Sequence, residues 1–177
     1  MKSKRIRLLM ASVFVAWLAG CMSPARKEAL VVDDASFGTK HPYSVSISTS
    51  GGGETSAIGY TNISNEDLAA AIEESIVATG LFSSVIKGNG ADYRLDVLLV
   101  SMSKPMFSFY FTIDMEMAWV LVNVRTGDAV MIESIRSSYT ETSGAFLAET
   151  KIRIAVEGAT QNNIRQGLNK IAALSLS

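Results

Sequence analysis

An uninterrupted alternation of apolar side chains over residues 107–124 constrains the fold of this chain more than any other feature. From Phe107 to Leu121, every second position carries a large apolar residue, which is the two-residue period of a β-strand. These positions are Phe107, Phe109, Phe111, Ile113, Met115, Met117, Trp119 and Leu121. The intervening positions are polar up to Glu116 and apolar from Ala118 onward. The pattern predicts one long strand with one face in the core and a second face whose covering changes along its length.

Shorter patterns predict further strands on both sides of the long one. Residues 43–48 and 92–101 alternate in polarity, and a short strand is expected at about 82–85. The sequence Arg-Thr-Gly-Asp at 125–128 predicts a tight turn, after which residues 129–140 return as the hairpin partner of the long strand.

Two segments have the apolar spacing of amphipathic helices. Ser64 is a suitable N-cap for the first, and Gly80 is a suitable residue just beyond its C-terminus. The second runs from about residue 145 to 176, and two unusual residues lie within its apolar stripe. Asn163 needs a buried partner or a marginal position there. Gly167 would allow a close approach to the sheet.

The order of these elements indicates the fold class. A strand and a helix are followed by a short strand, three meandering strands and a final helix. We predict an α+β fold, a two-layer sandwich with an antiparallel-rich sheet of about four to five strands and two helices on one face. Because the final helical segment is long, a break near Gly158 or Gly167 stays open.

The first 21 residues have the three-part layout of a secretory signal. Residues 1–7 carry four positive charges, and the apolar run at 8–18 is too short for a comfortable membrane span. The run leads into Leu-Ala-Gly-Cys, and Cys21 is the only cysteine of the chain. This stretch resembles the lipobox of bacterial lipoprotein precursors.

The resemblance implies that residues 1–20 are a signal peptide, and that Cys21 then carries a diacylglyceryl group on sulfur and an acyl chain, such as palmitate, on its amine. More than one chain is needed for stable anchoring. Met22 stands where an Asp would retain an enteric lipoprotein in the inner membrane, which implies the outer membrane, on its periplasmic side. The alternative is an ordinary signal peptide, or an uncleaved anchor, with a coincidental cysteine.

The mature chain is expected to have two parts. Residues 21–42 are predicted to be a lipidated tether, spanning about 25 Å as a flexible coil, and residues 43–177 a single periplasmic domain. Within the tether, residues 29–32 could form a short strand that docks on the domain. Without the signal peptide, 12 basic residues face 17 acidic residues, a net charge of −5. This acidic balance argues against nucleic acid or an anionic lipid surface as a partner. With Cys21 lipidated, no thiol is left for a disulfide.

The domain also resembles small periplasmic lipoproteins, including the auxiliary lipoproteins of ABC-type lipid transport systems. The resemblance rests on Gly80-Leu81-Phe82, on Ala91-Asp92-Tyr93-Arg94-Leu95, on Thr126-Gly127 and on the alanine-containing C-terminal helix. It implies a shared fold rather than a shared activity. Cys21 is the only functional residue that either resemblance supplies.

Few residues are suited to catalysis. His41 is the only histidine, and beside a proline at the domain edge it is expected at the surface. Nucleophilic triads and histidine-based zinc sites would therefore depend on His41 alone. Asp114 and Glu116 would lie roughly 7 Å apart on one strand face, where they could act as acid and base, hold a cation or simply be solvated. The glycines at 51–53 lack the residues that complete a phosphate loop and predict a flexible loop or hairpin. We expect no enzyme, cofactor or metal site.

Two functions remain from different classes. The first is a non-catalytic accessory or partner-binding component of a cell-envelope transport or assembly system, whose protein partner could add a strand to a sheet edge. The alternative is a carrier of a lipid or another apolar ligand, with the apolar row at 107–119 as a wall of its cavity. A carrier needs an apolar pocket of roughly 300 Å³ or more, whereas a partner-binding module should be solidly packed.

Overall fold

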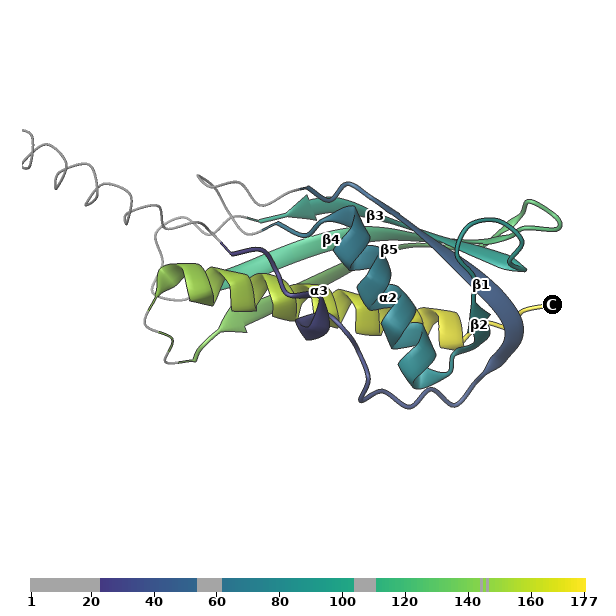
Figure 1. Cartoon of the computed structure of the whole chain (residues 1–177), viewed down its shortest axis with the longest axis horizontal. Helices are drawn as coiled ribbons and strands as arrows, with labels where there is room; N and C mark the ends of the chain where they lie inside the picture. Colours follow the sequence, from purple (N-terminus) through teal and green to yellow (C-terminus); the bar gives the residue numbers. More distant parts are fainter. Residues whose placement is uncertain (1–22, 54–61, 104–110, 144, 146) are drawn as a thin grey trace, which may run out of the picture.

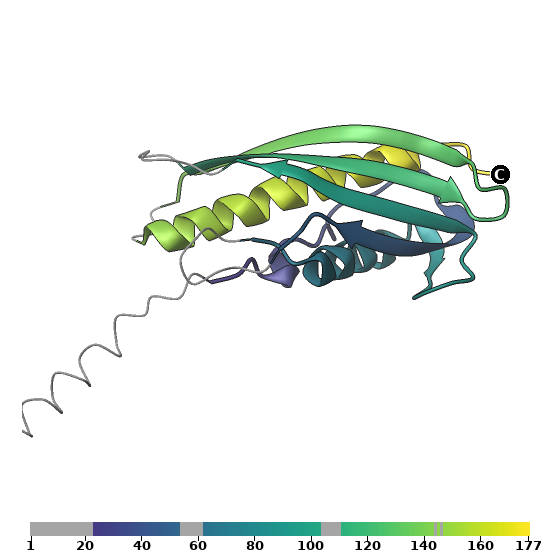
Figure 2. The same ribbon diagram turned by 90° about the horizontal axis from the view of Figure 1, so that it is seen from above.

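The computed structural model describes residues 23–53, 62–103, 111–143, 145 and 147–177 (Figure 1). In chain order, the elements are η1 (Lys27–Ala29), β1 (His41–Ser50), α2 (Asn65–Thr79), β2 (Phe82–Val85), β3 (Tyr93–Met102), β4 (Phe111–Asn123), β5 (Ala129–Glu141) and α3 (Ala148–Ala172). Both α-helices lie on the same face of one sheet (Figure 2). The predicted α+β two-layer sandwich is confirmed.

The five strands form a mixed sheet in the order β2-β1-β3-β4-β5. β1 pairs in parallel with β2 and with β3, whereas β3, β4 and β5 form an antiparallel meander. β1 and β2 are parallel because α2 carries the chain back along the sheet between them, and parallel neighbours need such a crossover. The meander contains the longest strands, so the sheet remains close to the antiparallel-rich arrangement expected from the sequence.

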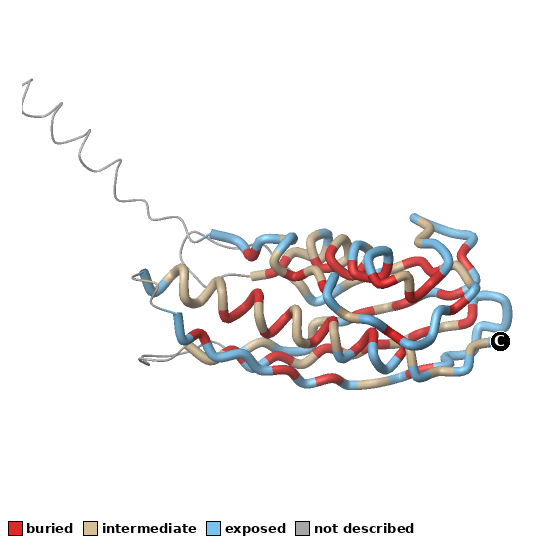
Figure 3. Tube along the Cα trace, turned by 90° about the horizontal axis from the view of Figure 1, so that it is seen from below, coloured by how far each residue is buried: buried red, intermediate tan, exposed pale blue. Residues whose placement is uncertain are grey.

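β4 follows the predicted alternation over its whole described length. The apolar residues of β4 that face the helices and are buried are Ile113, Met115, Met117, Trp119 and Leu121. Figure 3 shows the same change between buried and exposed positions along the strands of the meander. Residues 104–110, where the sequence pattern begins with Phe107 and Phe109, lie outside the described part of the chain.

α2 begins and ends where its sequence signals predict. The Ser64 hydroxyl accepts a hydrogen bond from the Asp67 N–H at 3.0 Å, which is an N-cap contact. At the other end, Gly80 takes the left-handed conformation with φ of 63°, and its N–H bonds the carbonyl groups of Ile76 and Val77.

α3 is one continuous helix, without a break at either glycine, and it begins at Ala148 rather than near residue 145. Both glycines instead allow α3 to approach the sheet closely. A Cβ atom on Gly167 would lie 2.6 Å from the Trp119 ring, and one on Gly158 would lie 2.5 Å from the Tyr139 ring. These distances are too short for any real Cβ contact, so glycine is required at both positions for this packing.

Asn163 is fully buried in the same interface and has three partners. Its side-chain oxygen accepts a hydrogen bond from Trp119 Nε1 at 3.0 Å. Its amide nitrogen donates to the Ile135 carbonyl at 2.9 Å and lies 3.2 Å from Ser137 Oγ. The buried partner that the sequence requires for this residue is therefore supplied by β4 and β5.

The N-terminal segment differs from the expected tether. Residues 23–34, called the N-terminal strap below, lie across the helix layer, and Ala25, Leu30 and Val32 are buried in the core. Within the tether predicted for residues 21–42, the strap at 23–34 is therefore not a free coil. Burying its apolar side chains outweighs the conformational entropy that this short segment loses when it is ordered. Neither described α-helix is long and apolar enough to cross a membrane.

Candidate functional site

The face of the sheet opposite the helices changes character along β4. Thr112, Asp114 and Glu116 make the polar end of this face, and Ala118 and Val120 begin its apolar end. No described helix or strand packs on this side of the meander (Figure 2). The sequence predicted this change from polar to apolar, and we call the surface the uncovered face.

Asp114 and Glu116 point to the same side, as predicted, but Glu116 is already paired. Its carboxylate accepts a hydrogen bond from the Ser134 hydroxyl at 2.5 Å and from Arg136 Nε at 3.1 Å. The Ser134 hydroxyl, and then the Arg136 guanidinium, lower the pKa of Glu116 below its ordinary value of 4.5. Glu116 therefore stays ionised near neutral pH and is poorly suited to donate a proton.

A pocket of about 400 Å³ lies beside Asp114 and Glu116. It is lined by Ser101, Ser103, Asp114, Met115, Glu116, Arg136, Ser137 and Ser138. Ser103 closes one side through a pair of hydrogen bonds with the backbone of Asp114, each 2.8 Å long. The lining offers hydroxyl groups, carboxylates and one guanidinium, which can bind polar groups of a partner but include no histidine or thiol. Within the described residues, no cluster of three or more His, Cys, Asp or Glu side chains could hold a metal.

His41 lies at a different place and is not a surface residue. It is 4 % exposed, its Nε2 donates to the Ile171 carbonyl at 3.0 Å, and its ring lies 5.3 Å from that of Phe82. The expected surface position is therefore wrong: β1 begins at His41 and carries the ring under the C-terminal end of α3. A buried histidine bonded to a helix carbonyl supports the fold. His41 is not among the residues that line the pocket beside Asp114 and Glu116.

The glycines at 51–53 form a loop, as predicted, and the N–H groups of Gly52 and Gly53 are bonded within the protein. The Gly52 N–H donates to Asn65 Oδ1 at 2.9 Å, and the Gly53 N–H donates to the Ile63 carbonyl at 3.0 Å. A phosphate loop needs such N–H groups free to point at a ligand. These glycines instead join the end of β1 to the start of α2.

The apolar end of the uncovered face exposes several large side chains from neighbouring strands. Its exposed members are Leu98 and Val100 on β3 and Val130 and Ile132 on β5, with Ala118, Val120 and Val122 of β4 between them. Val120 lies opposite both Asp96 and Ile132 in the ladders, and Ile132 is 74 % exposed. Contiguous apolar surface with a polar rim is typical of a binding surface.

The rim of this apolar area is polar on the β1 side. Ser46 and Ser48 of β1 lie beside Arg94 and Asp96 of β3, and these last two residues form an ion pair with Nε and Oδ2 2.9 Å apart. A pocket of about 250 Å³ crosses this boundary and is lined by Ser48 and Ser50 on one side and by Ala118 and Val120 on the other. The uncovered face therefore combines an apolar centre with polar groups around it, which is the usual anatomy of a protein interface.

The free edges of the sheet are less open than the uncovered face. β2, at one edge, has only four residues. At the other edge, α3 bonds two carbonyl groups of β5: Asn163 Nδ2 donates to Ile135 at 2.9 Å, and Asn162 Nδ2 donates to Ser138 at 3.1 Å. A strand of four residues offers little backbone for an added strand. On β5, the two bonded carbonyl groups are three residues apart, so one points to β4 and one to the free edge.

The interface between the helices and the sheet is filled where α3 meets β4 and β5. The Trp119 ring lies against Gly167, the Tyr139 ring lies against Gly158, and buried Asn163 bridges the two strands. The pockets of about 400 and 250 Å³ both lie on the other side of the sheet, and a third, of about 370 Å³, lies at the surface of α2 and β2, where Val77 and Val85 line it. This packing disfavours an acyl chain between the two layers. Cys21 and the preceding signal residues lie outside the described part of the chain.

No protein-family model matches this chain, and neither does any curated protein sequence. Several solved structures share its fold. Protein XCC0632 of family DUF330 from Xanthomonas campestris matches with a TM-score of 0.58 and 11 % identity, over 80 % of this chain and 88 % of that protein. The hypothetical protein CT253 from Chlamydia trachomatis matches with a TM-score of 0.56 and 10 % identity, over 76 % and 96 %.

A third structure with this fold is described as a minor lipoprotein, from Acinetobacter baumannii. It matches with a TM-score of 0.51 and 12 % identity, over 73 % of this chain and 90 % of that one. At such low identity, these likenesses concern the fold alone. The sandwich with two helices on one face therefore occurs in several bacterial proteins, at least one of which is described as a lipoprotein.

Proposed function

We propose that this chain is a lipid-anchored protein of the bacterial cell envelope that binds a protein partner through its uncovered face and performs no catalysis. The observation that carries the proposal is the apolar end of that face, where Ile132 is 74 % exposed beside Val120. An aliphatic side chain of this size gains roughly 1.5–3 kcal/mol when it is fully buried. A partner that covers the face would recover this free energy.

The anchor part of the proposal comes from the N-terminal sequence. A lipidated Cys21 would hold the mature protein at the outer membrane, on its periplasmic side, as part of a transport or assembly system. The fold shared with a minor lipoprotein from Acinetobacter baumannii is compatible with this location. The acidic balance of the mature chain favours a protein over nucleic acid as the partner.

The side chains at the polar end of the uncovered face support a role without catalysis. Glu116 is ionised and paired with Ser134 and Arg136, and His41 is buried at another place. The proposed role of Asp114, Glu116 and Arg136 is to give a partner polar contacts beside the apolar area. Their arrangement along one strand pair would set its orientation, because charge complementarity provides specificity.

The anchor is tested by replacing Cys21. We expect Cys21→Ser to give an unprocessed precursor that takes up no labelled palmitate in cells, whereas the unchanged protein is labelled. Mass spectrometry of the native N-terminus provides the independent measurement, since the mature chain should begin at a lipid-modified Cys21. Equal labelling of the variant, or a native chain that begins at Met1, would contradict the anchor.

The binding face is tested with a matched pair of exposed apolar residues. Ile132→Asp puts a charge into the apolar end of the uncovered face, and Val77→Asp puts one on α2, where Val77 is 67 % exposed. In crosslinked pull-downs from intact cells, we expect Ile132→Asp to lose its crosslinked partner at least tenfold and Val77→Asp to keep it. Both variants should retain the circular dichroism spectrum and melting temperature of the unchanged protein. A partner retained equally by both would show that this face is not the binding surface.

A further inference from the structure

The N-terminal strap is fastened to α3 at its first described residue. The Ser23 N–H donates to Glu149 Oε1 at 3.0 Å, and Glu149 is the second residue of α3. Three residues later, the Arg26 N–H donates to Glu157 Oε1 at 2.9 Å. The strap therefore runs alongside the first turns of α3 from its beginning (Figure 1).

Glu157 makes the second fastening strong. It is 4 % exposed, and its carboxylate also lies 2.9 Å from Arg153 Nη1 and 3.5 Å from Arg26 Nε. A buried carboxylate that loses its partners is costly, because its charge is then desolvated without compensation. Detachment of the strap would remove both of the Arg26 contacts from Glu157. The protein is therefore more stable with the strap attached to α3 than with the strap detached.

Further contacts fasten the strap to both helices. The Val32 N–H donates to Ser75 Oγ on α2 at 2.9 Å, and Gln161 Nε2 on α3 donates to the Val31 carbonyl at 2.8 Å. Leu30, between these contacts and η1, is fully buried. The strap thus lies between the two helices as part of the packed domain.

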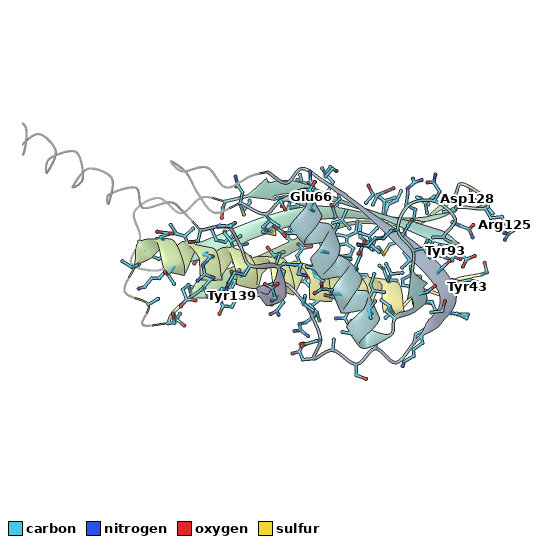
Figure 4. All side chains as sticks on the ribbon, in the orientation of Figure 1. Tyr43, Glu66, Tyr93, Arg125, Asp128 and Tyr139 are labelled. Atoms are coloured by element: carbon cyan, nitrogen blue, oxygen red, sulfur yellow. The ribbon has the colours of Figure 1, made fainter. Side chains whose placement is uncertain are left out.

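This fastening limits how far the domain can move from a lipid on Cys21. Cys21 precedes Ser23 by two residues, and two residues of chain span at most about 7 Å. Ser23 lies at the end of the molecule where α3 begins. The turn at Arg125 and Asp128 lies at the opposite end (Figures 1 and 4). β4 runs between the two ends, and its 13 residues span roughly 40 Å.

We propose that the strap fixes the orientation of the domain on a lipid bilayer, with the start of α3 at the membrane and the 125–128 turn pointing away from it. The inference rests on the proposed lipidation of Cys21. A flexible tether would let the domain tumble, whereas the fastened strap presents the uncovered face sideways, at a fixed height above the membrane. The partner of this end of the molecule is the lipid surface itself.

The orientation can be measured with two fluorescent labels on the full lipidated protein. The thiol of Cys21 is blocked by lipid, so a cysteine introduced as Leu147→Cys or as Asp128→Cys is labelled alone. Leu147 is 60 % exposed just before α3, and Asp128 is exposed at the far turn. In phosphatidylcholine vesicles with a headgroup-nitroxide lipid, we expect several-fold stronger quenching at position 147 than at 128. Equal quenching at the two positions would overturn the proposal.

Two further variants separate the strap from the anchor. A Gly/Ser linker of about 20 residues inserted between Met22 and Ser23 spans roughly 25 Å and leaves every strap contact in place. We expect it to abolish the difference between the two labels. Replacing both Leu30 and Val32 with Ser should detach the strap and have the same effect, provided the circular dichroism spectrum shows that the domain stays folded.

The outcomes distinguish failure of this inference from failure of the proposed function. Mass spectrometry of each preparation establishes whether Cys21 carries lipid. A chain without lipid would contradict the proposed anchor. A lipidated chain with equal quenching at positions 147 and 128, or with a label difference that the inserted linker leaves unchanged, would contradict the fixed orientation alone.

Discussion

The two faces of β4 share one alternating sequence but differ in what covers them. On the helix side, Trp119 packs on Gly167 and donates its indole N–H to Asn163. Its apolar surface is therefore buried, and its polar N–H has a hydrogen-bond partner. On the other side, Val120 stands next to Ile132, and no described element packs over them. A two-layer sandwich buries only one face of its sheet, so the fold itself does not require apolar residues on the second face, and the proposed partner would cover them.

The largest expected effect comes from removing the central side chain of the covered face. Trp119→Ala would leave a cavity under α3 and take the donor from the buried Asn163 oxygen. We expect a loss of about 3–5 kcal/mol in the free energy of unfolding, measured by urea denaturation. Val120→Ala, its neighbour on the uncovered face, is the control and should cost about 1 kcal/mol or less. Similar losses for both variants would contradict the difference between the faces.

A smaller effect is expected when α3 is pushed away from the sheet. Gly167→Ala would place a Cβ atom 2.6 Å from the Trp119 ring, whereas Gly38 has no atom within 4 Å of the corresponding position. We expect Gly167→Ala to cost about 1–3 kcal/mol in urea denaturation, although alanine favours helices over glycine. Gly38→Ala should be nearly neutral. A stabilised Gly167→Ala variant would mean that the contact between α3 and Trp119 is looser than described.

The smallest effect concerns the charged end of the uncovered face. The Ser134 hydroxyl, and then Arg136, lower the pKa of Glu116 in the folded protein. The stability from this carboxylate is therefore present above its ordinary pKa of 4.5 and is lost as the pH falls through the lower folded value. We expect Glu116→Gln to reduce slightly the fall in melting temperature between about pH 5 and pH 3, because exposed pairs contribute little. An unchanged pH profile would show that the pair has no energetic role.

Much of the fold could be predicted because its signals are local. The β4 alternation, the Ser64 cap and the Gly80 terminus each depend on residues close in sequence, and each is found where it was expected. Asn163 and Gly167 were recognisable as unusual in an apolar stripe. Their partner Trp119 was not, because it lies 44 positions from Asn163 along the chain.

The N-terminal strap shows where local signals fail. The charges at residues 26–28 resemble those of a solvated linker, and the sequence indicated only that residues 29–32 could dock on the domain as a short strand. These residues do pack on the domain, but not as a strand. The burial of the strap depends on Glu157, Ser75 and the groove between two helices, all distant in sequence. The same limit applies to His41, whose neighbouring proline indicates an edge but not the Ile171 carbonyl above it.

By itself, the amino-acid sequence determined the periods, the helix ends and the change from polar to apolar along one strand, because these follow from backbone geometry and from neighbours one to four residues away. It also contains the Leu-Ala-Gly-Cys stretch from which lipidation is inferred. Only the tertiary structure decided that Glu116 is paired, that the strap is fastened to α3 and that Trp119 packs against Gly167 and Asn163. These properties depend on contacts between segments that are distant in sequence. Such contacts are determined by how the whole chain packs, not by any local stretch of residues.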